Sequence, residues 1–322
     1  RSTQAKTLFP YTTLFRSETS FCMISCIIPS RNEVFMPQTV DDLFAKAAGL
    51  VEVIVVLDGY WPEVYPKENP NLHYIHFPGA KGMRNAINSG AAMAKGKYLL
   101  KCDAHCMFAE GWDTVLAADC DDDWVVIPRR YSLNPINWGI DKNGKPPRDY
   151  HYLDFPHWDK PHDAGMHGLE WWERGKERSA PEYDIDDNMS CQGSCWFMSK
   201  HHFDNFLHGM SEVGYGTFTQ EFQEIGNKTW LGGGRVVVNK KTWYAHLHKG
   251  KTYGRMWHQS RNDREQVIAG HGWSAQYWMR NQWQERKHDF EWLIDKFWPV
   301  PTWEQFGSVD NAFKAWREHY DN

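Results

Sequence analysis

The 322-residue sequence predicts an α/β fold, built on a mostly parallel sheet with helices on both faces. Three short apolar runs, Ser25–Ser30, Val51–Leu57 and Lys97–Cys102, have the length and continuity of buried strands. Two segments with helical spacing of apolar residues, Gln38–Leu50 and Lys81–Lys95, alternate with them. This order is typical of a parallel sheet, in which ligands bind beyond the carboxyl ends of the strands.

The second half of the sequence continues the sheet but contains a long irregular segment. Val125–Pro128, Cys191–Met198 and Arg235–Asn239 resemble strands, and Phe218–Leu231 predicts a helix. Arg129–Asn188 is polar and rich in Pro, Asp, His and Trp, with little periodicity. A long irregular stretch inside a compact domain is typical of a functional loop or a binding insertion.

The composition is that of a globular protein with an unusual number of aromatic residues. Hydrophobic residues make up 41% of the chain and charged residues 24%, and no apolar run approaches the roughly 20 residues that span a bilayer. The net charge of −5 argues against indiscriminate, charge-driven binding to nucleic acid, although a local basic groove is compatible with it. The 18 Trp supply either core packing or flat faces for sugars and bases.

The first 17 residues are not expected to belong to the fold. Thr7–Ser17 (TLFPYTTLFRS) resembles the translation of a common sequencing-adapter oligonucleotide, which indicates a gene from an environmental assembly. We expect the native chain to start later, near Met23. Residues 1–17 carry three basic and no acidic residues, so the remaining chain has a net charge of −8 where the whole chain has −5.

The seven cysteines predict a reduced protein. Their number is odd and no secretory signal precedes them, so a cytoplasmic location is favoured over a disulfide framework. The pairs Cys102/Cys106 and Cys191/Cys195 have a spacing that a structural zinc site tolerates. Because both pairs lie in apolar, strand-like segments, burial without a metal is the favoured interpretation.

Asp103 and His105 form the most informative motif of the sequence. They follow the third apolar strand, at the edge of the sheet where a carboxylate and an imidazole can hold a divalent cation. A third ligand should come from a distant segment. His246 and His248 lie after the strand-like Arg235–Asn239 and are the candidates.

The stretch around these two histidines is strongly basic. It contains Lys240, Lys241, Lys249, Lys251 and Arg255. Cations beside a metal ion suit a diphosphate ligand, because both stabilise its negative charge. A solvated basic loop with incidental histidines is the alternative.

A set of motifs runs in a fixed order from about Ser25 to Lys251. It comprises Asn32-Glu33, Asp58, Gly82-Met83-Arg84, Gly90-Ala91-Ala92, Asp103, His105, Gly111-Trp112, Gln192-Gly193-Ser194, Glu221, Glu224, Trp230, Gly232-Gly233 and His246. In this order they resemble the family-2-like GT-A glycosyltransferases, most closely the catalytic domain of the polypeptide N-acetylgalactosaminyltransferases. The ordered set is far more specific than any one of its members.

The resemblance implies a GT-A fold and a metal-dependent enzyme that moves a sugar from a UDP-sugar to a hydroxyl group, with retention. The ion would be Mn²⁺ or another divalent cation, with Asp103, His105 and His246 as its ligands. Asp103 is therefore also a catalytic candidate. The family's Trp-Gly-Gly before the first Glu is replaced by Phe218-Thr219-Gln220, which leaves the identity of the sugar open.

The resemblance also suggests how the chain is divided. Residues 18–128 would form the nucleotide-sugar-binding half, and residues 129–250 the acceptor-binding half of the same domain. Residues 251–322 form an aromatic-rich C-terminal extension, which the resemblance does not explain.

Five residues are assigned to the donor, and Asp103, already named as a metal ligand, is one of them. Asp58 is expected to contact uracil or ribose, with a plain Asp-Gly turn as the alternative. Arg84 is expected to steady Asp103 or the diphosphate, with an exposed helical arginine as the alternative. Arg31 and Lys249 complete this set as further contacts to the donor.

The remaining candidates concern the acceptor. Glu221 lies where GT-A enzymes place an acidic residue near the sugar, and it would act as general base in an inverting reaction or orient the sugar in a retaining one. Glu224 and His248 are candidate substrate contacts, although Glu224 also fits a solvated helix face. Trp171 and Trp172 correspond to a Trp-bearing loop at the family's acceptor site, with core packing as the alternative.

Three classes of acceptor compete. A hydroxymethylated pyrimidine in DNA, such as 5-hydroxymethylcytosine, is the substrate of phage DNA glycosyltransferases, and it suits an unanchored, reduced enzyme from an environmental gene. It also suits the cations and Trp residues that interleave in Lys240–Arg264 and around Trp273, Trp278 and Trp283. Ser/Thr of a protein and a bacterial glycan are the alternatives. A non-catalytic carbohydrate-binding protein is least favoured, because the metal motif is intact.

Overall fold

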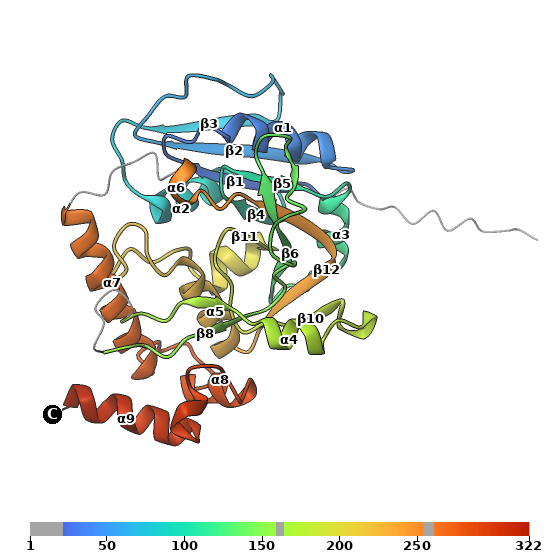
Figure 1. The fold of residues 1–322 in the computed structure, drawn as a ribbon. Helices are drawn as coiled ribbons and strands as arrows, with labels where there is room; N and C mark the ends of the chain where they lie inside the picture. Colours follow the sequence, from blue (N-terminus) through green and yellow to red (C-terminus); the bar gives the residue numbers. More distant parts are fainter. Residues whose placement is uncertain (1–21, 159–163, 254–260, 322) are drawn as a thin grey trace, which may run out of the picture.

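The computed structural model describes residues 22–158, 164–253 and 261–321 (Figure 1). The strands are β1 (Ile24–Ser30), β2 (Val51–Asp58), β3 (Leu72–Phe77), β4 (Tyr98–Cys102), β5 (Cys106–Phe108), β6 (Trp124–Asn134), β7 (Gly139–Ile140), β8 (His151–Leu153), β9 (Gly168–Glu170), β10 (Ile185–Asp187), β11 (Cys195–Ser199) and β12 (Arg235–His246). The α-helices are α1 (Met36–Lys46), α2 (Met83–Met93), α3 (Trp112–Ala118), α4 (Trp172–Glu177), α5 (Glu221–Leu231), α6 (Gly250–Tyr253), α7 (Arg261–Met279), α8 (Phe290–Lys296) and α9 (Val309–Asp321). Short helical segments of other types are η2 (Pro181–Tyr183), η3 (His202–Phe206) and η4 (Glu304–Phe306).

The central sheet has the predicted α/β organisation. Its strand order is β10-β12-β6-β11-β4-β1-β2-β3, with β5 beside β12 and β7 beside β6. β1, β2, β3 and β4 are parallel to their neighbours in this group, as the strand–helix pattern predicts. β3 was not predicted from the sequence, because it is an edge strand whose side chains are mostly only half-buried and it lacks a continuous apolar run. β8 and β9 form a separate two-stranded sheet.

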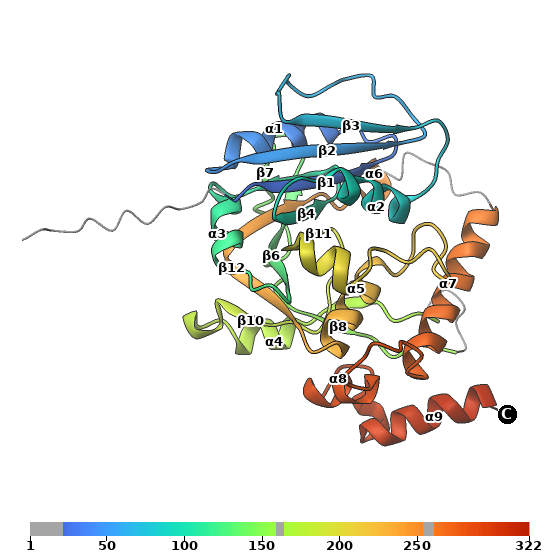
Figure 2. The same ribbon diagram turned by 180° about the vertical axis from the view of Figure 1, so that it is seen from behind.

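Helices cover both faces of the sheet, and alternate strand residues face opposite layers. Ile27 and Leu99 belong to the core on the side of α2 and α5. Ile28 and Leu100 belong to the core on the side of α1 and α3. The continuous apolar character of these strands follows from this burial on two sides. Figure 2 shows the same layers from behind.

A bulge in β12 brings its end to the carboxyl edge of the sheet. Asn239 pairs with Pro128 of β6, but Trp243 pairs with Arg129, so the register between the two strands shifts here. Proline has no N–H to donate to the ladder, which is why such irregularities collect beside it. β12 therefore extends beyond the predicted Arg235–Asn239, and its last residues pair antiparallel with β5, ending at His246.

The C-terminal helices pack onto the body of the protein. Trp278, Trp303 and Trp316 are buried in the same core as Trp196 of β11. Trp278 and Trp283 are only 1% and 6% exposed, so the prediction that these two rings stack on bases is wrong, whereas for the half-buried Trp273 it stays a prediction. Much of the aromatic excess thus serves the core. Among the described helices, none combines the length and the apolar character that a bilayer span requires.

Candidate active site

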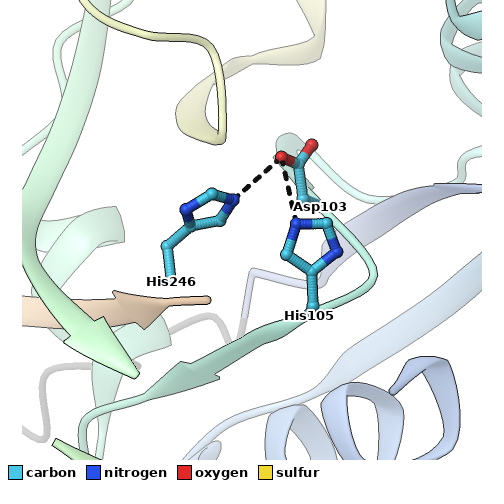
Figure 3. A group of neighbouring side chains, drawn as sticks. All are labelled: Asp103, His105 and His246. Atoms are coloured by element: carbon cyan, nitrogen blue, oxygen red, sulfur yellow. Dashed lines mark hydrogen bonds and ion pairs between the residues drawn. The ribbon is translucent and has the colours of Figure 1, made fainter. Parts of the chain in front are cut away.

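Three predicted metal ligands meet at the carboxyl edge of the sheet (Figure 3). Asp103 directly follows β4, and His105 ends the short turn that leads into β5. The antiparallel pairing of β5 with β12 places His246 opposite Cys106. The N–H of Leu247 also donates to the carbonyl oxygen of His105, at 3.1 Å. Two segments that are more than a hundred residues apart in sequence are thereby held together by backbone hydrogen bonds.

The geometry of these ligands suits a small divalent cation. His246 Nε2 lies 3.1 Å and His105 Nε2 lies 3.8 Å from Asp103 Oδ2, and one ligand atom from each of the three residues lies within 4.8 Å of the others. Around an octahedral ion with bonds of about 2.1 Å, adjacent ligand atoms lie about 3 Å apart and opposite ones about 4.2 Å apart. No other such group of three occurs in the described part of the chain, and the cysteines of the two pairs are buried and free.

The protonation states of the ligands also suit a metal ion. Burial alone would raise the pKa of Asp103, but the charge of Lys101 and a hydrogen bond from His246 outweigh it and hold that pKa well below its usual range. Burial lowers the pKa of His246 to about 4, against the opposing effect of Asp103. At neutral pH the carboxylate is ionised and the imidazole is neutral, which are the forms that bind metal ions.

Glu33 lies against Nδ1 of His105, the ring nitrogen that is not assigned to the metal. Its Oε2 lies 3.3 Å from His105 Nδ1, and its Oε1 accepts a hydrogen bond from Lys249. A carboxylate on the far nitrogen of a ligand histidine orients the ring and leaves the other nitrogen for the metal. The side chain of Lys249 is 15% exposed and sits beside the site through this pair. Its predicted contact with a diphosphate stays a prediction.

Lys101 is a central residue that the sequence reading missed. It lies in β4, is 1% exposed, and its Nζ donates to Asp103 Oδ1 at 3.0 Å, to Glu221 Oε2 at 3.1 Å and to the carbonyl oxygen of Gly193 at 2.8 Å. Both carboxylates raise the pKa of Lys101 enough to overcome the opposing effect of burial. One buried cation therefore links the metal-ligand carboxylate to the catalytic candidate.

Glu221 begins α5 and is 6% exposed. Trp196 Nε1 donates to its Oε1 at 2.8 Å, and Lys101 occupies its Oε2. Burial and, after it, the negative charge of Asp103 raise the pKa of Glu221, while Lys101 opposes both. The fold thus brings Glu221 next to Asp103 and fixes its carboxylate between two donors. Its catalytic role stays a prediction.

Asp58 ends β2, at the edge of the sheet where the sequence predicts it. Its carboxylate accepts hydrogen bonds from the N–H of Lys81 at 2.6 Å and of Gly82 at 3.1 Å, which fixes the chain just before α2. Gly82 has φ of 93°, and an added Cβ would lie 2.4 Å from Thr217. These bonds join residues more than twenty positions apart, so Asp58 does more than close a plain Asp-Gly turn, and its nucleoside contact stays a prediction. Arg31 follows β1 and is half-buried.

Arg84 does not reach Asp103, and that prediction is corrected. Its side chain is completely buried and pairs with Glu224. It also donates to the carbonyl oxygens of Ser211 at 2.8 Å and Thr219 at 2.7 Å, and lies over the ring of Tyr215 at 4.1 Å. Arg84 therefore ties α2 to α5 and to the loop between η3 and α5. Glu224 is 1% exposed, so it is neither a solvated helix face nor free to contact a substrate.

Arg84→Met is expected to destabilise the protein by about 3 kcal/mol. Removing one partner of a buried ion pair leaves the other charge uncompensated, although Lys228 still contacts Glu224 at 2.7 Å and limits the loss. Urea denaturation measures the change, and donor affinity should stay within a factor of two or so because the guanidinium is buried away from the site. The double variant Arg84→Met/Glu224→Leu should recover much of the stability. A stable Arg84→Met with weakened donor binding would restore the donor role.

The remaining candidates come from the start of α4 and from the segment just after β12. Trp171 is 8% exposed and packs edge-on against Tyr152. Of the two roles considered for this residue, it therefore has core packing and not the acceptor contact. Trp172 begins α4 and is half-buried, with Lys145 Nζ 5.8 Å from its ring. His248 is exposed just beyond β12. Acceptor contacts of Trp172 and His248 stay predictions.

Comparisons with known proteins agree with this architecture. Residues 25–207 match the family model described as Glycosyl transferase family 2. A crystal structure of GalNAc-T7 with UDP, GalNAc and Mn²⁺ is similar, with a TM-score of 0.61 and 17% identity over 87% of this chain and 57% of that chain. A crystal structure of S. aureus TarS 1–349 in complex with UDP-GlcNAc gives a TM-score of 0.48 and 14% identity over 91% of this chain and 75% of that chain. The curated proteins contain no significant match.

The likeness to GalNAc-T7 confirms the GT-A fold that the sequence predicts. The chain spans 57% of the length of that structure, so the likeness concerns part of a longer protein.

Proposed function

Because the chain belongs to glycosyl transferase family 2, we propose that it transfers a sugar from a UDP-sugar to an acceptor hydroxyl, with the help of a divalent cation. The observation that carries the proposal is the convergence of Asp103, His105 and His246 at the carboxyl edge of a parallel sheet. The similar fold of GalNAc-T7, whose structure contains UDP, GalNAc and Mn²⁺, supports UDP as the nucleotide and Mn²⁺ as the ion.

The protein's own groups would prepare the site for this reaction. A bound cation would supply charge neutralisation for the departing diphosphate. Lys101 holds the Asp103 carboxylate in place and ionised, and Glu33 orients His105. These residues keep the ligand atoms in position before substrate arrives, so little reorganisation is needed during transfer.

We assign Glu221 the task of orienting the donor sugar in a retaining reaction. Lys101 and Trp196 each donate to its carboxylate, so the group is fixed beside the metal ligands and is not free to swing toward an acceptor hydroxyl. A general base would need such reach. The retaining course that the sequence resemblance implies is consistent with this arrangement.

Glu221→Gln is expected to lower the turnover number by about a hundredfold, the effect of a slightly misplaced sugar, while UDP binding stays unchanged. Glutamine keeps the shape of the side chain but removes the negative charge of the carboxylate. That charge is neutralised by Lys101 and would interact with the donor sugar. Initial rates at saturating donor measure the first effect, and calorimetric titration with UDP and Mn²⁺ measures the second. The exposed Glu212→Gln is the matched control. Equal, small effects of the two substitutions would remove Glu221 from the catalytic site.

For the acceptor we propose a hydroxymethylated pyrimidine in DNA. The basic segment Lys240–Arg264 supports this choice less than the sequence suggests. Lys240 donates to the Arg178 carbonyl oxygen, and Lys241 and Lys249 pair with carboxylates. Residues 254–260, which include Arg255, lie outside the described residues. A surplus of positive charge elsewhere in the acceptor half supports the choice instead, as described below.

A panel of UDP-sugars and acceptors tests this function. The acceptors are duplex DNA with 5-hydroxymethylcytosine, a Ser/Thr peptide and a glycan, each read by its gain in mass with Mn²⁺ or with EDTA. We expect a mass gain of one sugar on the DNA, only in the presence of the metal. Transfer that persists in EDTA would contradict the metal-dependent mechanism. A mass gain on the peptide or the glycan alone would support the glycosyltransferase activity but would show that DNA is not the acceptor.

A further inference from the structure

A cavity of about 210 Å³ lies in the acceptor half, next to the active site. Its lining residues are Arg130 of β6, His151 of β8, Gly168, Leu169 and Glu170 of β9, and Gln192. We call it the Arg130 pocket. Its volume is far above the roughly 10–15 Å³ that one water molecule needs, so a larger group can enter.

Two connections tie the Arg130 pocket to the metal ligands. Arg130 lies two residues before Ser132, the partner of His246 in the register of β6 and β12, and alternate strand residues share a face. Gln192 directly precedes Gly193, whose carbonyl oxygen accepts from Lys101. In both views β8 lies in the lower part of the body, below β1, β2 and β3, with α8 and α9 lower still (Figures 1 and 2).

Positive charge exceeds negative charge around the pocket, because Lys145 and Arg148 lie just outside a lining that holds one charge of each sign, Arg130 and Glu170. Arg130 Nη2 lies 3.1 Å and Lys145 Nζ lies 3.3 Å from the carboxylate of Glu170, and Arg148 pairs with the same carboxylate. Three cations thus share one anion. Arg148 also donates to the hydroxyl of Ser132 at 3.1 Å. Because Ser132 pairs with His246 in the sheet, this positive charge lies on the side of the pocket nearest His246. In a chain with a net charge of −5, such a local surplus in a concave site attracts an anion.

Buried donors without partners line the pocket. His151 is 2% exposed, and neither of its ring nitrogens has a hydrogen-bond partner among the described residues. The Nε of Arg130, in a side chain that is 7% exposed, is also without one there. A buried polar group left unpaired costs about 1–3 kcal/mol, so such groups usually meet water or a ligand. Two N–H groups and a positive surplus around a cavity suit a ligand that offers oxygen acceptors and negative charge.

We propose that the Arg130 pocket binds a backbone phosphate of the DNA acceptor, next to the modified pyrimidine. This inference rests on the proposed function and specifies how its acceptor is held. The donor diphosphate belongs at the metal ligands, so an anion in this separate pocket comes from the acceptor. A phosphate contact here fixes the register of the DNA, while the hydroxymethyl group is presented to the site.

The test compares two duplexes that contain 5-hydroxymethylcytosine. One has ordinary phosphodiesters, and the other has uncharged methylphosphonates at the linkages flanking the modified base. Binding to each is measured by fluorescence anisotropy with UDP and Mn²⁺ present, so that the donor site is filled. Wild-type protein should bind the phosphodiester duplex about tenfold or more tightly, the effect of one charge-assisted hydrogen bond.

Variants of two neighbouring arginines assign that preference to the pocket. In Arg130→Gln the two duplexes should bind alike. Arg129→Gln, next to it on β6 but paired with Asp149 at 2.7 Å, should keep the preference. Equal binding of both duplexes to the wild type, or a preference that survives in Arg130→Gln, would overturn the proposal.

The outcome is separable from the proposed function. Slow hydrolysis of the UDP-sugar, in which a water molecule takes the sugar as UDP leaves, does not involve the pocket, and its absence would count against the proposed function alone. Arg130-dependent binding of a polyol-phosphate oligomer in place of DNA would overturn the assignment to a DNA phosphate.

Discussion

Asp103→Asn is expected to lower sugar transfer by about a thousandfold while the fold stays intact. The substitution keeps the shape of the side chain but removes the anionic oxygen that lies between His105 and His246. Loss of metal-assisted charge stabilisation is worth several kcal/mol in the transition state, and about 4 kcal/mol corresponds to a factor of a thousand. Lys101 retains Glu221 and the Gly193 carbonyl oxygen as partners, so its burial remains compensated.

Initial rates at saturating UDP-sugar and Mn²⁺ measure this effect, with circular dichroism and thermal unfolding as the check on the fold. Asp121→Asn is the matched control, because Asp121 is an exposed carboxylate after α3. The control should transfer sugar at the wild-type rate. A loss of less than about tenfold in Asp103→Asn would mean that its carboxylate does not hold the ion.

Lys101→Met is expected to cost about 3–5 kcal/mol of stability, the largest effect on folding that we predict from a single side chain. Methionine fills a similar space, but it leaves the carboxylates of Asp103 and Glu221 without the cation between them. Removing one partner of a buried ion pair is costly because the remaining charge stays buried and unpaired. Transfer should also fall, because both carboxylates lose their position.

Urea denaturation of Lys101→Met gives the free energy of unfolding. Lys97→Met, an exposed lysine just before β4, is the matched control and should change stability by less than about 0.5 kcal/mol. Adding Glu221→Gln to Lys101→Met should recover part of the lost stability, because one of the two unpaired charges is gone. A Lys101→Met protein as stable as the wild type would show that the three charges do not interact as the structure implies.

The fold and the metal ligands were predictable because their signals are local or ordered along the chain. Continuous apolar strands alternating with helices predict the parallel half of the sheet. Asp103 and His105 follow such a strand directly. His246 was distinguished from His248 only through the order of motifs, because the bulge opposite Pro128 hides the true length of β12 from a periodicity argument.

The residues that surround these ligands were harder to predict. Lys101 had a usable signal: it is the one charged residue in the apolar run of β4 and lies two residues before Asp103, on the same side of the strand. Arg84 and Glu224 had no such signal, because the distance between their helices depends on how α2 and α5 pack. Trp171 could not be assigned from its type, since tryptophan serves the core and binding sites alike.

The central question about this site is where a metal ion binds. A crystal soaked with Mn²⁺ and UDP, with anomalous diffraction to locate manganese, answers that question. We predict one strong peak within about 2.0–2.4 Å of Asp103 Oδ2, His105 Nε2 and His246 Nε2, with the diphosphate on its open side. A manganese peak with UDP bound elsewhere, touching none of these three residues, would contradict the account.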